Sequence, residues 1–257
     1  MKEKLVIVYT ISNDGLPGWK NSHGLREARI YLDFQVENSI RLGWRSEDIV
    51  IVTNFDHLPG SRVEYNNLGT DYFQGHAGGC LSKHIGMSWA LRSHNDSVFW
   101  LRDHDCWQVA RLTTPIRDLL GDMAFLVSGG NPPFSKVWKI SDQSCFMSCD
   151  WLDHLEKFIE KHKHKPRDFG FGFRLGKWIM NPGIPARVVP YRLAPWRFNL
   201  QSDWRKNINS IISAPIVCHH KLAHQDVAEF ASGQGHWDFL ELYSKFSSAL
   251  TSQQLSL

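Results

Sequence analysis

Short apolar runs rich in β-branched residues recur through the first half of the chain and alternate with segments of helical spacing. Three such runs are Lys4–Ile11, Asp48–Thr53 and Ser97–Leu101. Continuous apolar runs of this length are typical of strands buried on both faces, as in a parallel sheet. Between them, Glu27–Leu42 and Cys80–Arg92 repeat apolar residues near the helical period. The alternation predicts an α/β fold with a mainly parallel central sheet flanked by helices, and ligand sites at the carboxyl ends of its strands.

The second half of the chain is less regular. The remaining predicted elements are a short strand within 62–73, strands at Asp122–Val127 and Ser144–Cys149, and helical segments at Trp151–His162 and Val227–Leu250. Gly129–Pro133 is expected to break the sheet. Residues 165–206 mix Gly, Pro, Trp and Arg with little periodicity, so we expect long loops that line a site. We therefore expect one continuous domain whose regular half ends near residue 128.

Composition narrows the class of protein. The chain is 42% hydrophobic and 21% charged, as expected of a globular protein. No apolar run approaches the roughly 20 residues of a membrane span, and the start of the chain does not resemble a signal peptide, so a cytoplasmic protein without a membrane span is expected. The five cysteines are irregularly spaced, and no second pair completes a zinc site with Cys145 and Cys149, which favours buried thiols.

Positive charge is concentrated in residues 157–206, which hold 12 Lys and Arg residues against three Asp and Glu residues, together with nine aromatic residues. Basic and aromatic side chains in alternation suit nucleic acid, and Lys161–Arg167 would then contact phosphates. The same mixture suits sugars, since aromatic faces pack on pyranose rings. A solvated basic face over a Trp-rich core is the third interpretation.

The candidate chemistry lies at Asp103-His104-Asp105. Two carboxylates one residue apart can bind one divalent cation that also holds a diphosphate. The chain contains 17 aspartates in 257 residues, so about one Asp-x-Asp is expected by chance. Here, however, the pair directly follows the apolar run Val98–Leu101. Carboxylates at the end of a buried strand are costly without a function, and this context favours a metal site.

The surrounding residues resemble the GT-A glycosyltransferases. In that family a glycine-bearing loop leads into a helix with a basic residue, and an apolar strand and Asp-x-Asp follow. This chain has Gly78-Gly79, then Lys83 and Gly86, then Trp89-Ala90 before the strand. The resemblance covers about 28 residues and implies a GT-A-like fold. It also implies a metal-dependent transferase that moves a hexosyl or pentosyl group from a nucleotide-diphosphate sugar to a hydroxyl group. The acceptor would be a glycan or an anionic acceptor such as a hydroxymethylated DNA base.

The resemblance also assigns roles. Residues 1–128 would bind the nucleotide sugar and 129–257 the acceptor. The implied metal ligands for Mn²⁺ or Mg²⁺ are Asp103, Asp105 and a late histidine, His219 or His220. The implied donor-binding residues are Tyr9, Thr10, Asn54, Lys83 and Asp103. A histidine ligand would favour Mn²⁺. Lys83 could equally be a solvated helix residue, and the histidines could be bystanders.

Inverting transfer needs a general base on the acceptor hydroxyl, usually a carboxylate. Asp168 and Asp150 are the candidates, although Asp150 also suits a helix N-cap. A nucleotidyltransferase of similar fold remains an alternative, although Ser12–Gly24 matches its glycine-rich signature only loosely. A non-catalytic nucleic-acid-binding protein would explain the basic segment but not the acids after the strand. Hydrolase motifs of the GxSxG and HExxH types are missing from the sequence.

Overall fold

The computed structural model describes residues 1–10, 25–56, 63–69, 75–103, 106–130, 139–163, 173–190, 198–199, 216–218 and 224–251. Its main sheet has seven strands in the order β3-β2-β1-β4-β7-β6-β8. They are β1 (Lys2–Tyr9), β2 (Ile49–Thr53), β3 (Glu64–Asn67), β4 (Ser97–Asp103), β6 (Phe125–Gly130), β7 (Lys139–Ser148) and β8 (Ala186–Pro190). Only β7 among them runs antiparallel to its neighbours. The prediction of a mainly parallel central sheet is confirmed.

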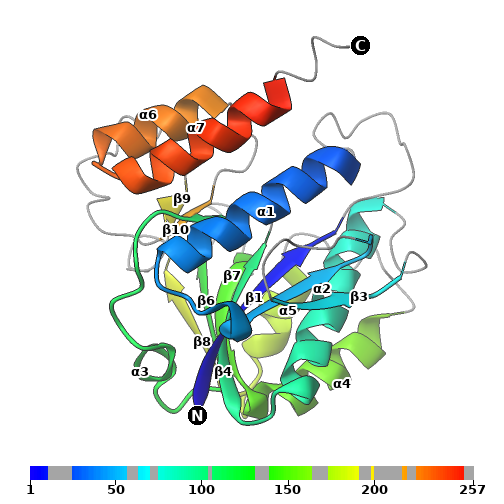
Figure 1. The fold of residues 1–257 in the computed structure, drawn as a ribbon. Coiled ribbons are helices and arrows are strands. Elements are labelled where there is room, and N and C mark those ends of the chain that lie inside the picture. The colour runs from blue at the N-terminus through cyan, green and yellow to red at the C-terminus, as the bar shows by residue number, and fades with distance from the viewer. Residues whose placement is uncertain are drawn as a thin grey trace.

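Helices cover both faces of this sheet (Figure 1). On one face lie α1 (Leu25–Arg41), α6 (His224–Gly233) and α7 (Trp237–Thr251), and on the other lie α2 (Gly75–Ser93), α4 (Leu152–His162) and α5 (Phe173–Ile179). The remaining helical segments are η1 (Ser46–Asp48), α3 (Ile116–Leu120) and η2 (Cys149–Trp151). The molecule is therefore a three-layer helix–sheet–helix sandwich.

The apolar run of β1 explains why both faces are covered. Leu5 and Ile7 pack into the core beneath α1 and α7, whereas Val6 and Val8 pack into the core beneath α2 and α4. All four side chains are at most 1% exposed. Successive strand residues point to opposite faces, so a strand that is apolar at every position must be covered twice.

A second, smaller sheet adjoins the first. It has the order β5-β10-β9, with β5 (Cys106–Gln108), β10 (Ile216–Cys218) and β9 (Phe198–Asn199). Trp107 of β5 is 1% exposed and contacts the rings of Tyr31 on α1 and Tyr243 on α7, with ring centroids 5.8 and 5.0 Å apart. The small sheet is therefore anchored to the α1–α7 side of the molecule.

Several element boundaries differ from the sequence predictions. Helix α2 begins at Gly75, so Gly78-Gly79 lies inside the helix and not in a preceding loop. Strand β6 continues through Gly129-Gly130, because a strand in a seven-stranded sheet keeps its ladder bonds despite the low strand preference of glycine. The predicted single helix at Val227–Leu250 is two helices, separated at Gly235, whose positive φ of 73° suits glycine.

The segment 165–206 also differs from the prediction of long loops. Its described part contains helix α5 and strand β8, which pairs in parallel with β6 at the edge of the main sheet. Pairing with β6 is a long-range contact, which local periodicity does not report.

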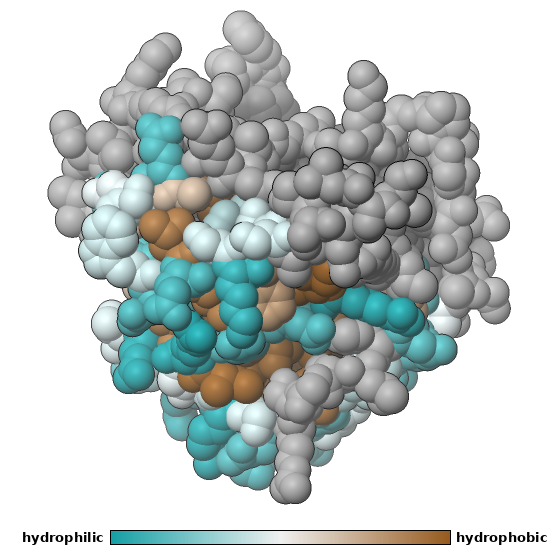
Figure 2. Space-filling model, turned by 45° about the horizontal axis from the view of Figure 1, so that its top comes forward, coloured by the Kyte–Doolittle hydropathy of each residue, from teal (hydrophilic) through white to brown (hydrophobic). Residues whose placement is uncertain are grey.

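Figure 2 shows one face of the molecule, on which hydrophilic residues of the described part lie beside apolar ones. On α7, for example, Asp238, Glu241 and Lys245 are exposed. None of the helices in the described ranges is both long enough and apolar enough to cross a bilayer.

Candidate active site

Four parallel strands end together at one edge of the main sheet. The register pairs Val8 of β1 with Asp103 of β4, Tyr9 with Thr53 of β2, and Thr53 with Asn67 of β3. Helix α1 leads from β1 to β2 on one side, while β4 lies on the other side of β1. Such a reversal of strand order leaves a crevice at the carboxyl ends, where α/β proteins bind ligands. Asp103 lies at this edge.

Lys83 of α2 faces Asp103. Its Nζ lies 3.0 Å from Oδ2 of Asp103, and the Lys83 side chain is only 7% exposed, against 17% for Asp103. A lysine that deep in the structure is not the solvated helix residue that the sequence left as an alternative. Burying either charge alone would be costly, so each stabilises the other at the end of β4.

Arg102, the residue before Asp103, lies on the opposite face of β4 and is fully buried. Its Nη2 donates to Oγ of Ser39 on α1 at 2.6 Å, and its guanidinium lies 5.3 Å from the ring centroid of Trp100. Burial lowers the pKa of Arg102 to about 9, partly offset by the electrostatic effect of Cys106, so the side chain remains charged at neutral pH. The sequence analysis missed this residue, although a cation at the end of an apolar run is a visible signal.

Lys83 and Arg102 place one positive charge on each face of β4 near its end, and the Asp103 carboxylate balances the charge of Lys83. One net positive charge, that of Arg102, therefore remains among these three residues, and it favours an anionic ligand at this end of the sheet.

The predicted nucleoside-binding residues are at the same edge, but two of them are buried. Tyr9 is 1% exposed and meets Phe55 edge to face, with ring centroids 6.0 Å apart, and Asn54 is 2% exposed. Thr10, directly after β1, is half-buried. Burial of Tyr9 and Asn54 limits what their side chains offer to a ligand in this conformation.

Three exposed polar residues at this edge, Asp56, Asn67 and Arg29, were missed. Nδ2 of Asn67 donates to Oδ1 of Asp56 at 2.7 Å, and Arg29 of α1 donates from Nε and Nη2 to the backbone carbonyl of Asp56 at 3.1 and 2.7 Å. Asp56 lies three residues after the end of β2, so its place after a buried strand could have indicated it. All three side chains are exposed, so they are accessible from solvent.

The metal candidates are described only in part. Asp105, His219 and His220 lie outside the described residues, as does His104. Within the described ranges no group of three His, Cys, Asp or Glu side chains could hold a metal ion. However, Cys106 pairs directly with Cys218 in the antiparallel ladder of the small sheet. In the sequence Cys106 follows Asp105, and Cys218 precedes His219.

Of the two candidate general bases, only Asp150 lies within the described residues. Asp168 lies outside the described residues. Asp150 is exposed in η2, directly after β7, whose last residue Ser148 pairs with Val98 near the start of β4. Asp150 is therefore at the edge of the sheet opposite to Asp103. Its carboxylate accepts a 3.4 Å hydrogen bond from Ser148, and the structure does not bring it to the candidate site.

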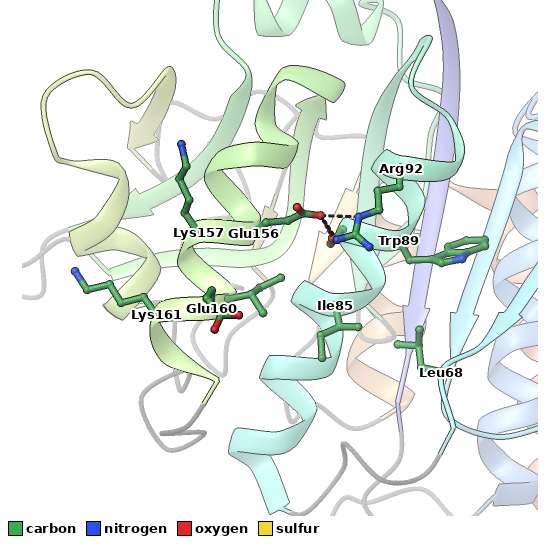
Figure 3. A pocket seen from close by; sticks show the side chains of 10 residues that line it. Leu68, Ile85, Trp89, Arg92, Glu156, Lys157, Glu160 and Lys161 are labelled. Atoms are coloured by element: carbon green, nitrogen blue, oxygen red, sulfur yellow. Dashed lines mark hydrogen bonds and ion pairs between the residues drawn. The ribbon is translucent and has the colours of Figure 1, made fainter.

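A groove of about 840 Å³ lies between α2 and α4 (Figure 3). Ile85, Trp89 and Leu68 form its apolar part, and an ion pair between Arg92 and Glu156 crosses it, with Nε of Arg92 2.6 Å from Oε1 of Glu156. None of the candidate site residues lines it. The groove is thus separate from the edge where Asp103 lies.

The fold is that of the GT-A-type glycosyltransferases. The chain is similar to the structure of a galactosyltransferase, LgtC, in complex with donor and acceptor sugar analogues, with a TM-score of 0.55 and 11% identity over 93% of this chain and 95% of that one. It is also similar to a glycosyltransferase involved in the glycosylation of the major capsid of PBCV-1, with a TM-score of 0.51 and 12% identity over 88% and 98% of the two chains.

At such low identity the likeness concerns the fold. No protein-family model matches the chain, and no curated protein sequence does so either. The GT-A-like architecture expected from the sequence is confirmed, and the chemistry must be argued from the site.

Proposed function

We propose that this protein is a metal-dependent glycosyltransferase that moves a sugar from a nucleotide-diphosphate sugar to a hydroxyl group. The observation that carries the proposal is the buried Lys83–Asp103 pair at the crevice edge of a GT-A-like sheet. A carboxylate there can bind a cation, and the net positive charge near it suits a diphosphate. A nucleotidyltransferase or a non-catalytic nucleic-acid-binding protein has no comparable support from the site.

We propose Asp103, Asp105 and His219 as the metal ligands. Support comes from the pairing of Cys106 with Cys218. Asp105 is bonded to Cys106 and His219 to Cys218, so the two candidate ligands are at most a few residue lengths apart. If the register continued by one pair, Asp105 would face His219, which favours His219 over His220. Two carboxylates and one imidazole suit Mn²⁺ better than Mg²⁺. When bound, the cation would neutralise the charge that develops on the leaving diphosphate.

The nucleoside would lie across the ends of β1 and β2. Thr10 and the backbone after Tyr9 and Asn54 are the first contacts, and Asp56 with Asn67 would reach the ribose or base from β3. Lys83 would hold the Asp103 carboxylate in place beside the diphosphate. Residues 1–128 would thus form the donor half, and residues 129–257 the acceptor half of one continuous domain.

A glycan is the proposed acceptor, with hexosyl and pentosyl donors both to be tested. If the reaction inverts the anomeric carbon, Asp168 is the proposed general base, since it lies in an aromatic and glycine-rich segment of the acceptor half. The basic residues of 157–206 would then contact acidic groups of the glycan.

The proposal is tested by a donor panel with Mn²⁺, measuring release of nucleoside diphosphate and transfer to saccharides. The double variant Asp103→Asn/Asp105→Asn should lose at least about a hundredfold in rate, because both carboxylate ligands are removed. Asp150→Asn is the matched control and should keep full activity, because Asp150 lies at the opposite edge. Full transfer activity in the double variant would contradict the proposal.

The acceptor class is tested by turnover at two salt concentrations. Transfer to neutral saccharides should change little between 50 and 200 mM salt, and transfer to an acidic glycan, which carries few charges, should fall only modestly. Transfer to hydroxymethylated duplex DNA, if it occurred through the basic segment, should fall steeply, because each phosphate contact releases counterions. If transfer to DNA is efficient and its rate falls steeply with salt, DNA and not a glycan is the acceptor.

A further inference from the structure

The small sheet places two cysteines directly opposite each other. Cys106 of β5 pairs with Cys218 of β10, and the antiparallel register continues through Trp107 with Val217 and Gln108 with Ile216. The two residues are far apart in the sequence, so only the pairing of the strands brings them together.

This placement satisfies the backbone geometry of a disulfide. Directly opposite residues in an antiparallel ladder have Cα atoms about 4.5 or 5.5 Å apart, with their side chains on one face. A disulfide needs a Cα separation of about 4.4–6.8 Å, and both ladder positions fall within that range. We propose that Cys106 and Cys218 are a cross-linking site, where a disulfide joins β5 to β10 under oxidising conditions.

The other cysteines in described elements lack such a position, and one of them, Cys80, lies in helix α2 and not in a ladder. Cys145 of β7 lies opposite Leu101 of β4 and Val127 of β6, so no cysteine faces it in the ladder. Cys149 lies in η2, at the edge of the main sheet opposite to Asp103. Either residue therefore provides an internal control for selective reaction of the Cys106–Cys218 pair.

The reaction is an ordinary exchange with a small disulfide such as oxidised glutathione. One protein sulfur attacks the small disulfide, whose S–S bond breaks, and a mixed disulfide forms as one small thiol leaves. The second protein sulfur attacks the mixed disulfide and releases the second small thiol. The protein gives up two electrons and two protons, and the small disulfide takes them up as two thiols.

Cys106 is fully buried, so the reaction requires a local opening. Cys106 and Cys218 lie in the three-stranded sheet and not in the seven-stranded sheet. Local opening of part of a protein costs less free energy than global unfolding. We therefore expect oxidation over minutes to hours without global unfolding.

The cross-link has a consequence that rests on the proposed function. The two cysteines are sequence neighbours of Asp105 and His219, the proposed ligands on the two chain segments. A covalent bond between β5 and β10 keeps these segments together when the small sheet would otherwise open. The oxidised protein should therefore hold Mn²⁺ several-fold more tightly than the reduced protein.

The cross-link is tested on the whole folded protein. After incubation with oxidised glutathione, remaining thiols are alkylated and the protein is digested and mapped without reduction. The expected product is a linked peptide pair containing Cys106 and Cys218, in the wild type and in the control Cys149→Ser. It should be missing in Cys106→Ala and in Cys218→Ala. The midpoint of thermal unfolding should rise by about 5–10 °C on oxidation of the wild type and of Cys149→Ser, but not on oxidation of the two alanine variants.

If a variant fails to fold, peptide mapping of the oxidised wild type alone shows whether the cross-link between Cys106 and Cys218 forms. Recovery of Cys106 and Cys218 on separate alkylated or glutathionylated peptides, or joined to other cysteines, overturns the proposal. A Mn²⁺ titration of the oxidised and the reduced protein, after removal of glutathione, tests the proposed metal site independently of the cross-link. If the cross-link forms but neither the oxidised nor the reduced protein binds Mn²⁺, the metal site is refuted and the cross-link is supported. Equal Mn²⁺ affinity in both forms refutes the effect on the ligands.

Discussion

The seven-stranded sheet is covered by helices on both faces, whereas the three-stranded sheet is joined to one side of the molecule through β5, where Trp107 is buried and Gln108 accepts hydrogen bonds from Asn38 and Trp44. The residues of β1 and β4 are nearly all buried in two separate cores. In the small sheet, Trp107 joins the ring cluster of α1 and α7. Within the described residues, the large sheet thus packs against helices on both faces, and the small sheet is joined to the α1–α7 side through β5.

The candidate active site lies at the junction of these two sheets. Asp103 ends β4 of the large sheet, and Cys106 begins β5 of the small one. The position of Asp103 is therefore fixed by the main core and by Lys83. The other proposed ligands, Asp105 and His219, are sequence neighbours of β5 and β10. We therefore expect opening of the small sheet to weaken metal binding before it affects the main core.

The largest expected effect is that of Trp107→Ala. Loss of this buried ring should cost about 3–5 kcal/mol of unfolding free energy, because it leaves a cavity among Tyr31, Phe34 and Tyr243. Trp237→Ala is the matched control, because Trp237 is 63% exposed, and it should change stability by less than about 0.5 kcal/mol. Urea unfolding measures both. Equal effects would show that the small sheet is not anchored through Trp107.

Removal of the cation that faces Asp103 should have the next largest effect. Lys83→Met should cost roughly 2–4 kcal/mol, since it leaves a partly buried carboxylate without its ion pair. The double variant Lys83→Met/Asp103→Asn should regain most of that stability, because no charge is left behind. Transfer activity should stay low in both variants.

A double-mutant cycle on these two residues, followed by urea unfolding, measures their coupling free energy. If the losses of unfolding free energy in the two single variants simply add up in the double variant, the ion pair does not hold Asp103 at the end of β4.

Gly86 tests how closely α2 lies on the large sheet. A Cβ at this position would lie 2.8 Å from Cγ1 of Val52, a buried side chain of β2. Gly86→Ala should therefore cost about 1–3 kcal/mol through overpacking. At Gly233, in α6, a Cβ would meet nothing within 4 Å, so Gly233→Ala should be neutral or slightly stabilising. Thermal unfolding of the two variants should separate them clearly, and similar midpoints would refute the close packing.

The smallest expected effect concerns His236, between α6 and α7. Burial lowers the pKa of His236 below its usual value of 6.5, so the folded protein binds the proton less readily than the unfolded chain. The contribution of neutral His236 is fully present above pH 6.5 and decreases as the pH falls below that value. The wild type should lose slightly more thermal stability between pH 7.5 and 5.5 than His236→Gln. Identical pH dependence in the two proteins would contradict this assignment.

Much of the main sheet was predictable from the sequence, and much of the small sheet was not. The apolar runs that became β1, β2 and β4 report burial on both faces by themselves. By contrast, β5 and β10 pair with each other although they are distant in the chain, which local periodicity does not report. Helix α5 and strand β8, inside the segment expected to form loops, were missed for the same reason.

The sequence by itself determined the alternation of strands and helices up to β4 and the position of Asp103 at the end of a buried strand. These features follow from local periodicity, because the spacing of apolar residues records which face is covered. The GT-A-like fold was implied by the resemblance of the residues around Asp103. Only the tertiary structure decided that Lys83 is buried against Asp103, that Asp150 lies at the far edge, and that Cys106 faces Cys218. Each depends on strand register and chain topology, which join residues that no local pattern connects.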